Sequence, residues 1–194
     1  MKLYYASGAC SLADHIALHE ARLAFEHESV DLKAKTTASG ADFTAINPKG
    51  YVPALVLDSG DMLTENIAVL DWIAGQNPML GVDGPLGRTR LLEALAYIST
   101  EVHKGFKPMF TGGSEDQKAE ARVVIAKRLQ LLADGLHGDY LFGDRPSVAD
   151  CYLFVMLLWS DKFDIAIPAP LPALRDRMMT RPAVQTAMRH EGLI

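Results

Sequence analysis

The chain has 194 residues, of which 49% are hydrophobic and 22% charged, and its formal net charge is −5. This length suits one large globular domain or two small ones, and the acidic balance excludes the basic face that a nucleic-acid-binding protein needs. The two cysteines, Cys10 and Cys151, form no disulfide framework, so we expect a cytoplasmic protein. We expect no signal peptide and no membrane span: the start MKLYYASGACS lacks a long apolar core. The longest apolar run, residues 151–159, is far shorter than the roughly 20 residues that a span needs.

The first half of the chain alternates between strand-like and helix-like patterns. Short apolar, aromatic and β-branched runs predict four strands, at residues 2–6, 25–32, 54–58 and 61–65. Apolar residues at helical spacing predict helices at 11–22 and 66–76, and the polar stretch 34–47 predicts irregular structure or a short helix. This order predicts a mixed four-stranded sheet with helices on its faces.

The second half reads as helical throughout. Residues 78–86 are rich in glycine and proline and predict a linker between a domain at 1–80 and an all-helical domain at 87–194. We expect three longer helices and two shorter ones: 88 to about 107, 115 to about 136, 148 to about 163, and two pieces that end near residue 190. Ser147 and Asp150 resemble a capping box before the third of these helices.

Cys10 lies in the stretch GACSLADHIALHEA, where a strand gives way to a helix. A helix N-terminus favours a thiolate, so we expect a depressed pKa for this thiol. Ala13 stands where a second, resolving cysteine would stand, so the thiol must act alone or with an external thiol. The alternative is a small buried hydrophobic residue, which is how we interpret Cys151.

Two further stretches predict ligand contacts. In LTEN, Glu65 and Asn66 follow a strand and open a helix, where free N–H groups suit a carboxylate and Glu65 suits an ammonium. The alternative is that Thr64 or Asn66 only caps the helix. In GYVPAL, Val52 and Pro53 precede a strand, and the spacing does not decide between a cis bond and an ordinary trans proline.

The histidines give weaker signals. His103 lies late in a helix, near a break at Pro108, where a lone histidine is usually just partly buried. His15 and His19 have the i, i+4 spacing of a metal pair, but no third ligand stands out, so the sequence predicts no metal.

A few polar side chains are ambiguous from their position alone. Lys35 and Lys49 are by default solvated charges. Tyr4 and Tyr5 lie in a predicted strand, where tyrosines generally pack in the core. The hydroxyls of these tyrosines and of Ser11 are nevertheless candidates for hydrogen bonds to a thiolate.

Taken together, these segments resemble one family. The whole chain is similar to bacterial cytosolic glutathione S-transferases of the beta class. The resemblance rests on MKLYY, GACSLADHIAL, VDLKAK, NPKGYVPALVLDSGDMLTEN, TEVHKGFKPMF and SVADCYLF. It implies a thioredoxin-like N-terminal domain, an all-helical C-terminal domain, a homodimer, and glutathione as co-substrate in detoxification.

The resemblance assigns roles to individual residues around glutathione. Cys10 matches the cysteine beside the glutathione sulfur, and Val52 matches the residue whose backbone pairs with the cysteinyl unit, with Pro53 in cis. Glu65 and Asn66 match the pair that holds the γ-glutamyl end.

Other matches lie farther along the chain. Lys35 matches a lysine near the glycine carboxylate, His103 matches the histidine that approaches the sulfur from the second domain, and Lys104 follows it as in the family.

Two positions depart from the pattern. Asn66 stands where relatives often have serine or glycine but keeps the backbone N–H. Ala96 replaces an asparagine that often points at the site, which puts that contact and the partner-subunit contribution in doubt.

The resemblance implies conjugation of the glutathione thiolate to a hydrophobic electrophile, with Cys10, Ser11 and His103 as candidates for stabilising the thiolate. Phe106, Met109 and Phe110 are candidates for the electrophile pocket. Two alternatives remain. One is glutathione-dependent reduction of disulfides or peroxides through Cys10, and the other is a non-catalytic protein that binds ligands or a partner.

Overall fold

The structure is a computed structural model that describes residues 1–194. Its N-terminal part is built on a mixed sheet with strand order β3-β2-β1-β4-β5. The strands are β1 (Lys2–Tyr5), β2 (Glu26–Asp31), β3 (Thr36–Thr37), β4 (Ala54–Val56) and β5 (Met62–Thr64). Strands β1 and β2 are parallel, and the other pairs are antiparallel. The thioredoxin-like mixed sheet that the sequence predicts is therefore confirmed.

The number of strands is the one correction to this sheet. We expected four strands, and the structure adds β3, a two-residue strand that pairs with the end of β2 through Val30–Thr37 and Asp31–Thr36. It lies in the polar stretch for which irregular structure or a short helix is expected. The expected short helix is also present there, as α2 (Phe43–Ile46).

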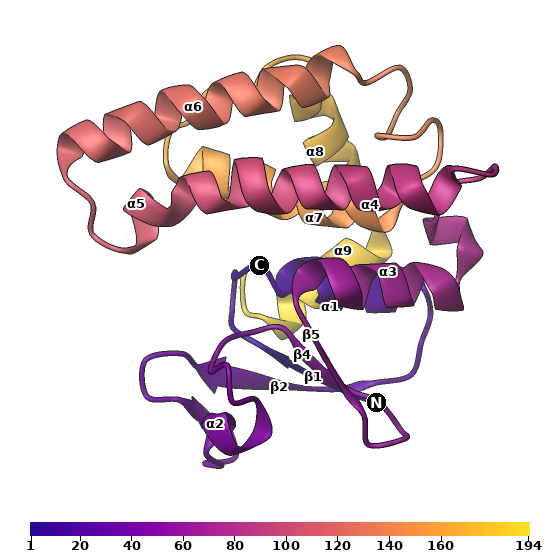
Figure 1. The fold of residues 1–194 in the computed structure, drawn as a ribbon, viewed down its shortest axis with the longest axis vertical. Helices are drawn as coiled ribbons and strands as arrows, with labels where there is room; N and C mark the ends of the chain where they lie inside the picture. Colours follow the sequence, from indigo (N-terminus) through magenta and orange to yellow (C-terminus); the bar gives the residue numbers. More distant parts are fainter.

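Helices cover the sheet and separate it from the second half of the chain. Figure 1 shows α1 (Leu12–Glu20) and α3 (Asn66–Gln76) lying between the sheet and an upper layer of helices. The last helix, α9 (Pro182–His190), returns from the C-terminal half and packs against α1. The two halves of the chain thus share an interface through the first and last helices.

The second half is helical, as expected. A short 3-10 turn (Pro78–Leu80) leads to α4 (Gly87–Tyr97), and α6 (Glu115–Asp134), α7 (Val148–Lys162) and α8 (Leu171–Met179) complete the upper layer. Between α4 and α6 the chain passes through a π-helical segment (Ile98–Val102), a 3-10 turn (His103–Phe106) and α5 (Lys107–Phe110). Pro108 has no N–H to continue a helix, so it is accommodated in the first turn of α5.

Helix α7 forms the centre of the upper layer. Twelve of its 15 residues are buried, so the apolar run that includes Cys151 is a core helix. Its capping box is present: Asp150 accepts hydrogen bonds from the N–H and the hydroxyl of Ser147, at 2.8 and 2.7 Å. The other oxygen of Asp150 accepts from the Leu141 N–H at 2.8 Å, which also orders the preceding loop. No helix combines the length and the apolar character that crossing a membrane requires.

Candidate functional site

A cavity of about 290 Å³ lies where the starts of α1 and α3 meet the segment between α4 and α5. Small-molecule sites are commonly found at such junctions between domains. The cavity wall contains a thiol, a carboxylate, an imidazole, an ammonium and two phenols. Its lining residues are Cys10, Tyr51, Val52, Pro53, Glu65, Asn66, Ile67, Ser99, His103, Lys104 and Tyr152.

Cys10 is placed by the turn that joins β1 to α1. Gly8 adopts a positive φ of 65° in this turn, a conformation that glycine tolerates without steric cost. The Cys10 carbonyl accepts a 2.8 Å hydrogen bond from the side-chain amide of Asn66, the first residue of α3. The Cys10 thiol makes a weak 3.8 Å contact to the Val52 carbonyl oxygen. The thiol is thus held between the starts of two helices and the loop before β4.

The expectation of a depressed Cys10 pKa is wrong for the free protein. Burial raises the pKa of the Cys10 thiol to about 12, and the Asp14 carboxylate adds to this rise. The N–H groups of Cys10 and Ser11 act in the expected direction and lower the pKa, but their effect is smaller. Cys10 is half-buried and lines the cavity, but the protein atoms packed around it desolvate the thiolate, and this effect outweighs that of the helix N-terminus. The thiol is therefore protonated at neutral pH.

Glu65 stands at the N-terminal end of α3 with an unusual backbone. Its φ is +72°, a region that non-glycine residues rarely adopt and that is concentrated at functional sites. One carboxylate oxygen, Oε1, accepts from Lys49 Nζ at 2.5 Å and from the Tyr51 hydroxyl at 2.7 Å. These two hydrogen bonds lower the pKa of Glu65. The carboxylate is consequently ionised at neutral pH, and its Oε2 has no partner among the protein side chains.

The backbone beside Cys10 offers a further polar group. The Val52–Pro53 peptide bond is cis, as the resemblance implies. The Val52 side chain is buried, whereas its N–H donates to no backbone oxygen. An extended ligand in the cavity can therefore pair with this N–H.

His103 reaches the cavity because the helix changes its winding just before it. The π-helical segment Ile98–Val102 ends at His103, and such segments are frequent at functional sites. Its Nδ1 lies 2.6 Å from the Tyr152 hydroxyl, and its ring meets Trp159 edge to face at 5.0 Å. Burial, with a contribution from the Lys104 charge, lowers the pKa of His103 to about 4. The imidazole is neutral at pH 7.

Three predicted site residues stand elsewhere or act differently. The Ser11 hydroxyl is fully buried and accepts from the Ala6 N–H at 3.2 Å, so it does not reach the cavity. Lys35 does not line the cavity either, since its Nζ donates to the Gly50 carbonyl at 2.6 Å. Asn66 lines the cavity, but its side-chain amide holds Cys10 and Asp14.

The residues expected to form an electrophile pocket do not line this cavity. Phe106 is fully buried, and neither Met109 nor Phe110 lines the cavity. Phe110 is 49% exposed and packs edge to face on Trp159 and Phe163. The hydroxyl of Tyr5 donates to the His190 carbonyl, away from the cavity. Ala96 is exposed on α4 and does not line the cavity.

Sequence reasoning missed several functional groups. Tyr51, Ser99 and Tyr152 line the cavity, and Lys49 holds Glu65. Tyr51 and Lys49 belong to the same NPKGYVP turn as Val52, which the resemblance assigns to glutathione binding. Their closeness to Val52 in the chain was the one signal that could have identified them. Ser99 lies in the π-helical segment and Tyr152 in α7, and tertiary packing brings both to the cavity.

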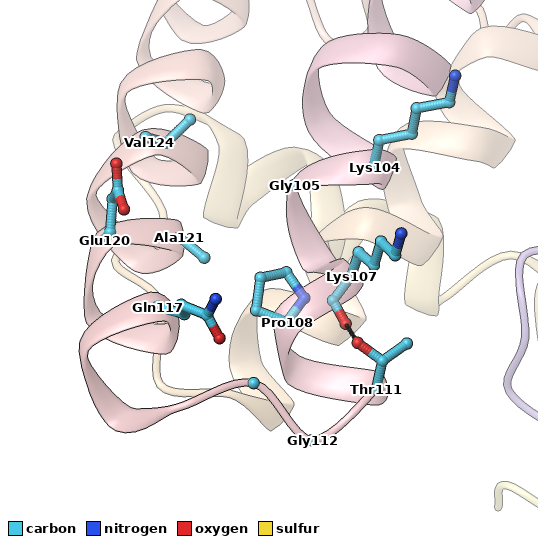
Figure 2. Close-up of a pocket in the computed structure, with 11 residues that line it drawn as sticks. Lys104, Gly105, Lys107, Pro108, Thr111, Gly112, Gln117, Glu120, Ala121 and Val124 are labelled. Atoms are coloured by element: carbon cyan, nitrogen blue, oxygen red, sulfur yellow. Dashed lines mark hydrogen bonds between the residues drawn. The ribbon is translucent and has the colours of Figure 1, made fainter.

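A larger hollow of about 600 Å³ lies between α5 and the start of α6 and shares only Lys104 with the first cavity. Figure 2 shows Pro108 facing Gln117 and Ala121 across it, while the ammonium groups of Lys104 and Lys107 point away from α6. No group of titratable side chains converges in it. The smaller cavity is therefore the candidate site.

Known proteins resemble this chain over its full length. The family models for the N-terminal and C-terminal domains of glutathione S-transferase match residues 9–76 and 96–182. Glutathione S-transferase GstA of Escherichia coli O157:H7 is 41% identical over 200 positions, covering all of both chains. The chain belongs to the glutathione S-transferase family. Glutathione S-transferase GST-4.5 of Xanthomonas campestris is also similar, with 36% identity over all of both chains.

Solved structures agree with this assignment. A sphingomonad glutathione S-transferase in complex with glutathione has a TM-score of 0.92 and 44% identity, covering all of both chains. BphK, a bacterial glutathione S-transferase solved as a ternary complex, has a TM-score of 0.93 and 47% identity, again over all of both chains. A beta-class enzyme of Sphingomonas chungbukensis is equally similar, with a TM-score of 0.92. The resemblance to the bacterial beta class is confirmed.

The burial of Cys10 makes a prediction about its reactivity in the free transferase. Because the pKa is raised to about 12, the rate of Cys10 alkylation should keep rising with pH well beyond the ordinary thiol pKa of about 8.5. Asp14→Asn removes a charge that raises this pKa and keeps an acceptor for Asn66, so it should make alkylation faster at pH 9. Cys151 is fully buried and should not contribute to the signal.

The matched control is Asp116→Asn, which removes an exposed charge at the start of α6 and should leave the profile unchanged. The measurement is the pseudo-first-order rate of iodoacetamide labelling between pH 6 and 10, followed by mass spectrometry. An inflection below 8.5 in the parent would contradict the dominance of burial, and an Asp14→Asn profile identical to the parent would contradict the added contribution of Asp14.

Proposed function

We propose that this glutathione S-transferase binds glutathione in the 290 Å³ cavity, with the sulfur between Cys10 and His103, and conjugates it to a hydrophobic electrophile. The γ-glutamyl ammonium is held by the free Oε2 of Glu65, and its carboxylate by the first N–H groups of α3, which have no partner within the helix. The cysteinyl unit pairs with the Val52 backbone. Lys104 lines the same wall and supplies a positive charge for the glycine carboxylate of glutathione.

The chemistry depends on hydrogen bonds to the glutathione sulfur. The Cys10 thiol is protonated and the His103 imidazole is neutral, so both can donate a hydrogen bond to a sulfur anion. Such donors stabilise the thiolate over the thiol and lower the pKa of the bound glutathione, whose proton leaves to solvent. The thiolate then attacks an electrophilic carbon, the C–S bond forms, and the leaving group departs with its electron pair.

The burial of Cys10 supports conjugation over thiol–disulfide exchange. Exchange requires Cys10 itself to be a thiolate, and a pKa of about 12 makes that form scarce at neutral pH. As a donor, the same thiol assists the sulfur of glutathione. We therefore assign Cys10 to binding and orienting the sulfur.

We also propose a cytoplasmic homodimer. Both cysteines are free thiols, which fits a reducing compartment. Val123, Val124 and Leu131 are exposed on α6, at 71%, 39% and 59%, and Tyr51 beside the cavity is 44% exposed. A second copy of the chain that covers these apolar side chains would complete the surface around the cavity mouth.

The dimer proposal predicts a mass. At micromolar concentration we expect sedimentation at close to twice 21.2 kDa, because burial of the apolar α6 residues favours association. Val123→Glu places a charge on the most exposed of them and should shift the mass toward that of the monomer. Lys118→Glu, at the start of the same helix, is the matched control and should leave the dimer intact. A parent protein that sediments as a fully active monomer would refute the dimer.

The binding role of Glu65 makes a prediction about affinity. Glu65→Gln keeps the size of the side chain but removes the charge that attracts the ammonium, and hydrogen bonds to charged groups contribute about 1.5–3 kcal/mol. The dissociation constant for glutathione should therefore rise about ten- to a hundredfold. The KM for 1-chloro-2,4-dinitrobenzene should stay nearly level, because the electrophile does not touch this end of the tripeptide. Calorimetry and initial rates of conjugation measure the two effects.

The matched control for Glu65→Gln is Lys49→Gln. This variant breaks the same exposed Lys49–Glu65 ion pair, which contributes at most about 1 kcal/mol to stability, but leaves the Glu65 carboxylate in place. It should bind glutathione as well as the parent, or more tightly. Unchanged glutathione affinity in a folded Glu65→Gln protein would show that Glu65 only favours the start of α3.

A further inference from the structure

Four of the six histidines of the chain gather in one cluster outside the glutathione cavity. His15 and His19 lie on α1, His27 on β2, and His190 at the end of α9. The ring centres of His27 and His190 are 4.4 Å apart, and that of His15 is 5.0 Å from His27 and 5.5 Å from His190. The sequence shows only the His15–His19 spacing, and the fold supplies the third ligand that it lacks.

The ring nitrogens approach the spacing of a metal site. One nitrogen from each of His15, His27 and His190 lies within 4.8 Å of the others. His15 Nε2 and His190 Nδ1 are 3.4 Å apart, and two nitrogens bound to a tetrahedral Zn²⁺ at 2.0–2.1 Å stand about 3.3 Å apart. These two nitrogens share a hydrogen-bond contact in the metal-free protein, at a separation close to the one that a shared ion requires. His190 is exposed and His27 is half-buried, so small ring rotations can bring the third nitrogen closer.

A buried carboxyl group, that of Glu191, lies against the innermost of these rings. Glu191 Oε1 lies 3.0 Å from His15 Nδ1, and both side chains are fully buried. A histidine that binds a metal through one nitrogen almost always donates its other N–H to a carboxylate, carbonyl or water. The Glu191 contact occupies Nδ1 of His15 and leaves Nε2, the nitrogen nearest His190, for an ion.

A further nitrogen beside the cluster has no partner. The His19 ring stacks on His15, with ring centres 5.3 Å apart, and its Nε2 is buried without a hydrogen bond. Buried polar atoms without a partner are rare and often indicate an ion or water.

We propose that His15, His27 and His190 bind a divalent transition-metal ion, most simply Zn²⁺. Imidazole nitrogens suit this class of ion, and a three-histidine site leaves a fourth position for water or for His19. The ion would join α1 and β2 of the N-terminal half to α9, the last helix of the chain.

The site has a physical route to the glutathione cavity. Glu191, which orients His15, also accepts the Gly8 N–H at 2.9 Å through its other oxygen. The Gly8 carbonyl accepts from Trp159 Nε1 at 2.9 Å, and Trp159 packs on His103. A metal ion at the cluster would therefore hold in place the turn that carries Cys10.

The test is a Zn²⁺ titration of the tag-free transferase after EDTA treatment, in competition with a chromogenic chelator. We expect one equivalent of bound Zn²⁺ and a higher melting temperature with the ion. His190→Ala and His27→Ala should each weaken Zn²⁺ binding by more than roughly tenfold. A loss of roughly tenfold is expected when the removed residue only orients a metal ligand. Both positions are solvent-accessible, so both variants should fold, and without metal they should melt close to the metal-free parent.

Two control variants exclude other sites. His137→Ala removes an exposed histidine elsewhere on the surface, and Cys10→Ala removes the thiol beside His103; both should bind Zn²⁺ as the parent does. Absence of a stoichiometric site in the parent would overturn the proposal. So would loss of binding in Cys10→Ala, or binding in His27→Ala and His190→Ala that equals that of the parent.

Discussion

The side-chain amide of Asn66 joins the starts of α1 and α3, and the geometry of the glutathione cavity depends on it. Its Nδ2 donates to the Cys10 carbonyl at 2.8 Å and to Asp14 Oδ2 at 3.0 Å. Asp14 is fully buried, so loss of the amide would leave its Oδ2 unpaired, at a cost of about 1–3 kcal/mol, whereas the Cys10 carbonyl would keep its hydrogen bond from the Ala13 N–H at 3.1 Å. The hydrogen bonds bring the thiol on one helix and the Glu65 carboxylate on the other to a single cavity. One end of glutathione and its sulfur are thereby positioned by the same contact.

Burial decides the electrostatics of this cavity. It keeps Cys10 protonated and His103 neutral, so the wall around the sulfur position holds hydrogen-bond donors without a charge of its own. The ionised Glu65, with Lys49 and Tyr51 attached, stands at the more exposed end. The cavity thus has uncharged donors at its buried end and charged groups at its exposed end. This arrangement suits glutathione, whose charged amino-acid end stays near water while its sulfur becomes an anion at the buried end.

The sequence predicted the parts of this enzyme that depend on local pattern. The strands, the helices and the Ser147–Asp150 cap follow from residues close together in the chain. The local pattern left LTEN open between a ligand contact and a helix cap, and the family resemblance favoured the contact of Glu65. The two-residue strand β3 was missed because Thr36–Thr37 is too short to show an alternating pattern. The prediction of a depressed Cys10 pKa was wrong because the sequence shows only the helix start. The surrounding atoms and the buried Asp14 side chain, which raise this pKa, are brought together only by folding.

Tertiary packing also explains the remaining misses. Tyr152 reaches His103 from α7, 49 residues away, and His190 reaches His15 from the last helix, 175 residues away. Neither pair has a spacing that a single sequence reveals. The prediction for the Ser11 hydroxyl was wrong because closeness in the chain does not ensure closeness to the cavity. Ser11 follows Cys10 directly, yet its hydroxyl faces the β1–α1 turn.

The central claim is that uncharged donors lower the pKa of bound glutathione, and the ultraviolet absorbance of its thiolate measures this directly. In Cys10→Ser the serine hydroxyl still donates a hydrogen bond, and with Cys151 buried the titrating signal comes from glutathione alone. The account predicts a bound pKa below the ordinary thiol value of about 8.5, and a rise toward that value when His103→Ala is added. A bound pKa at or above 8.5 in Cys10→Ser, or one that His103→Ala leaves unchanged, would contradict it.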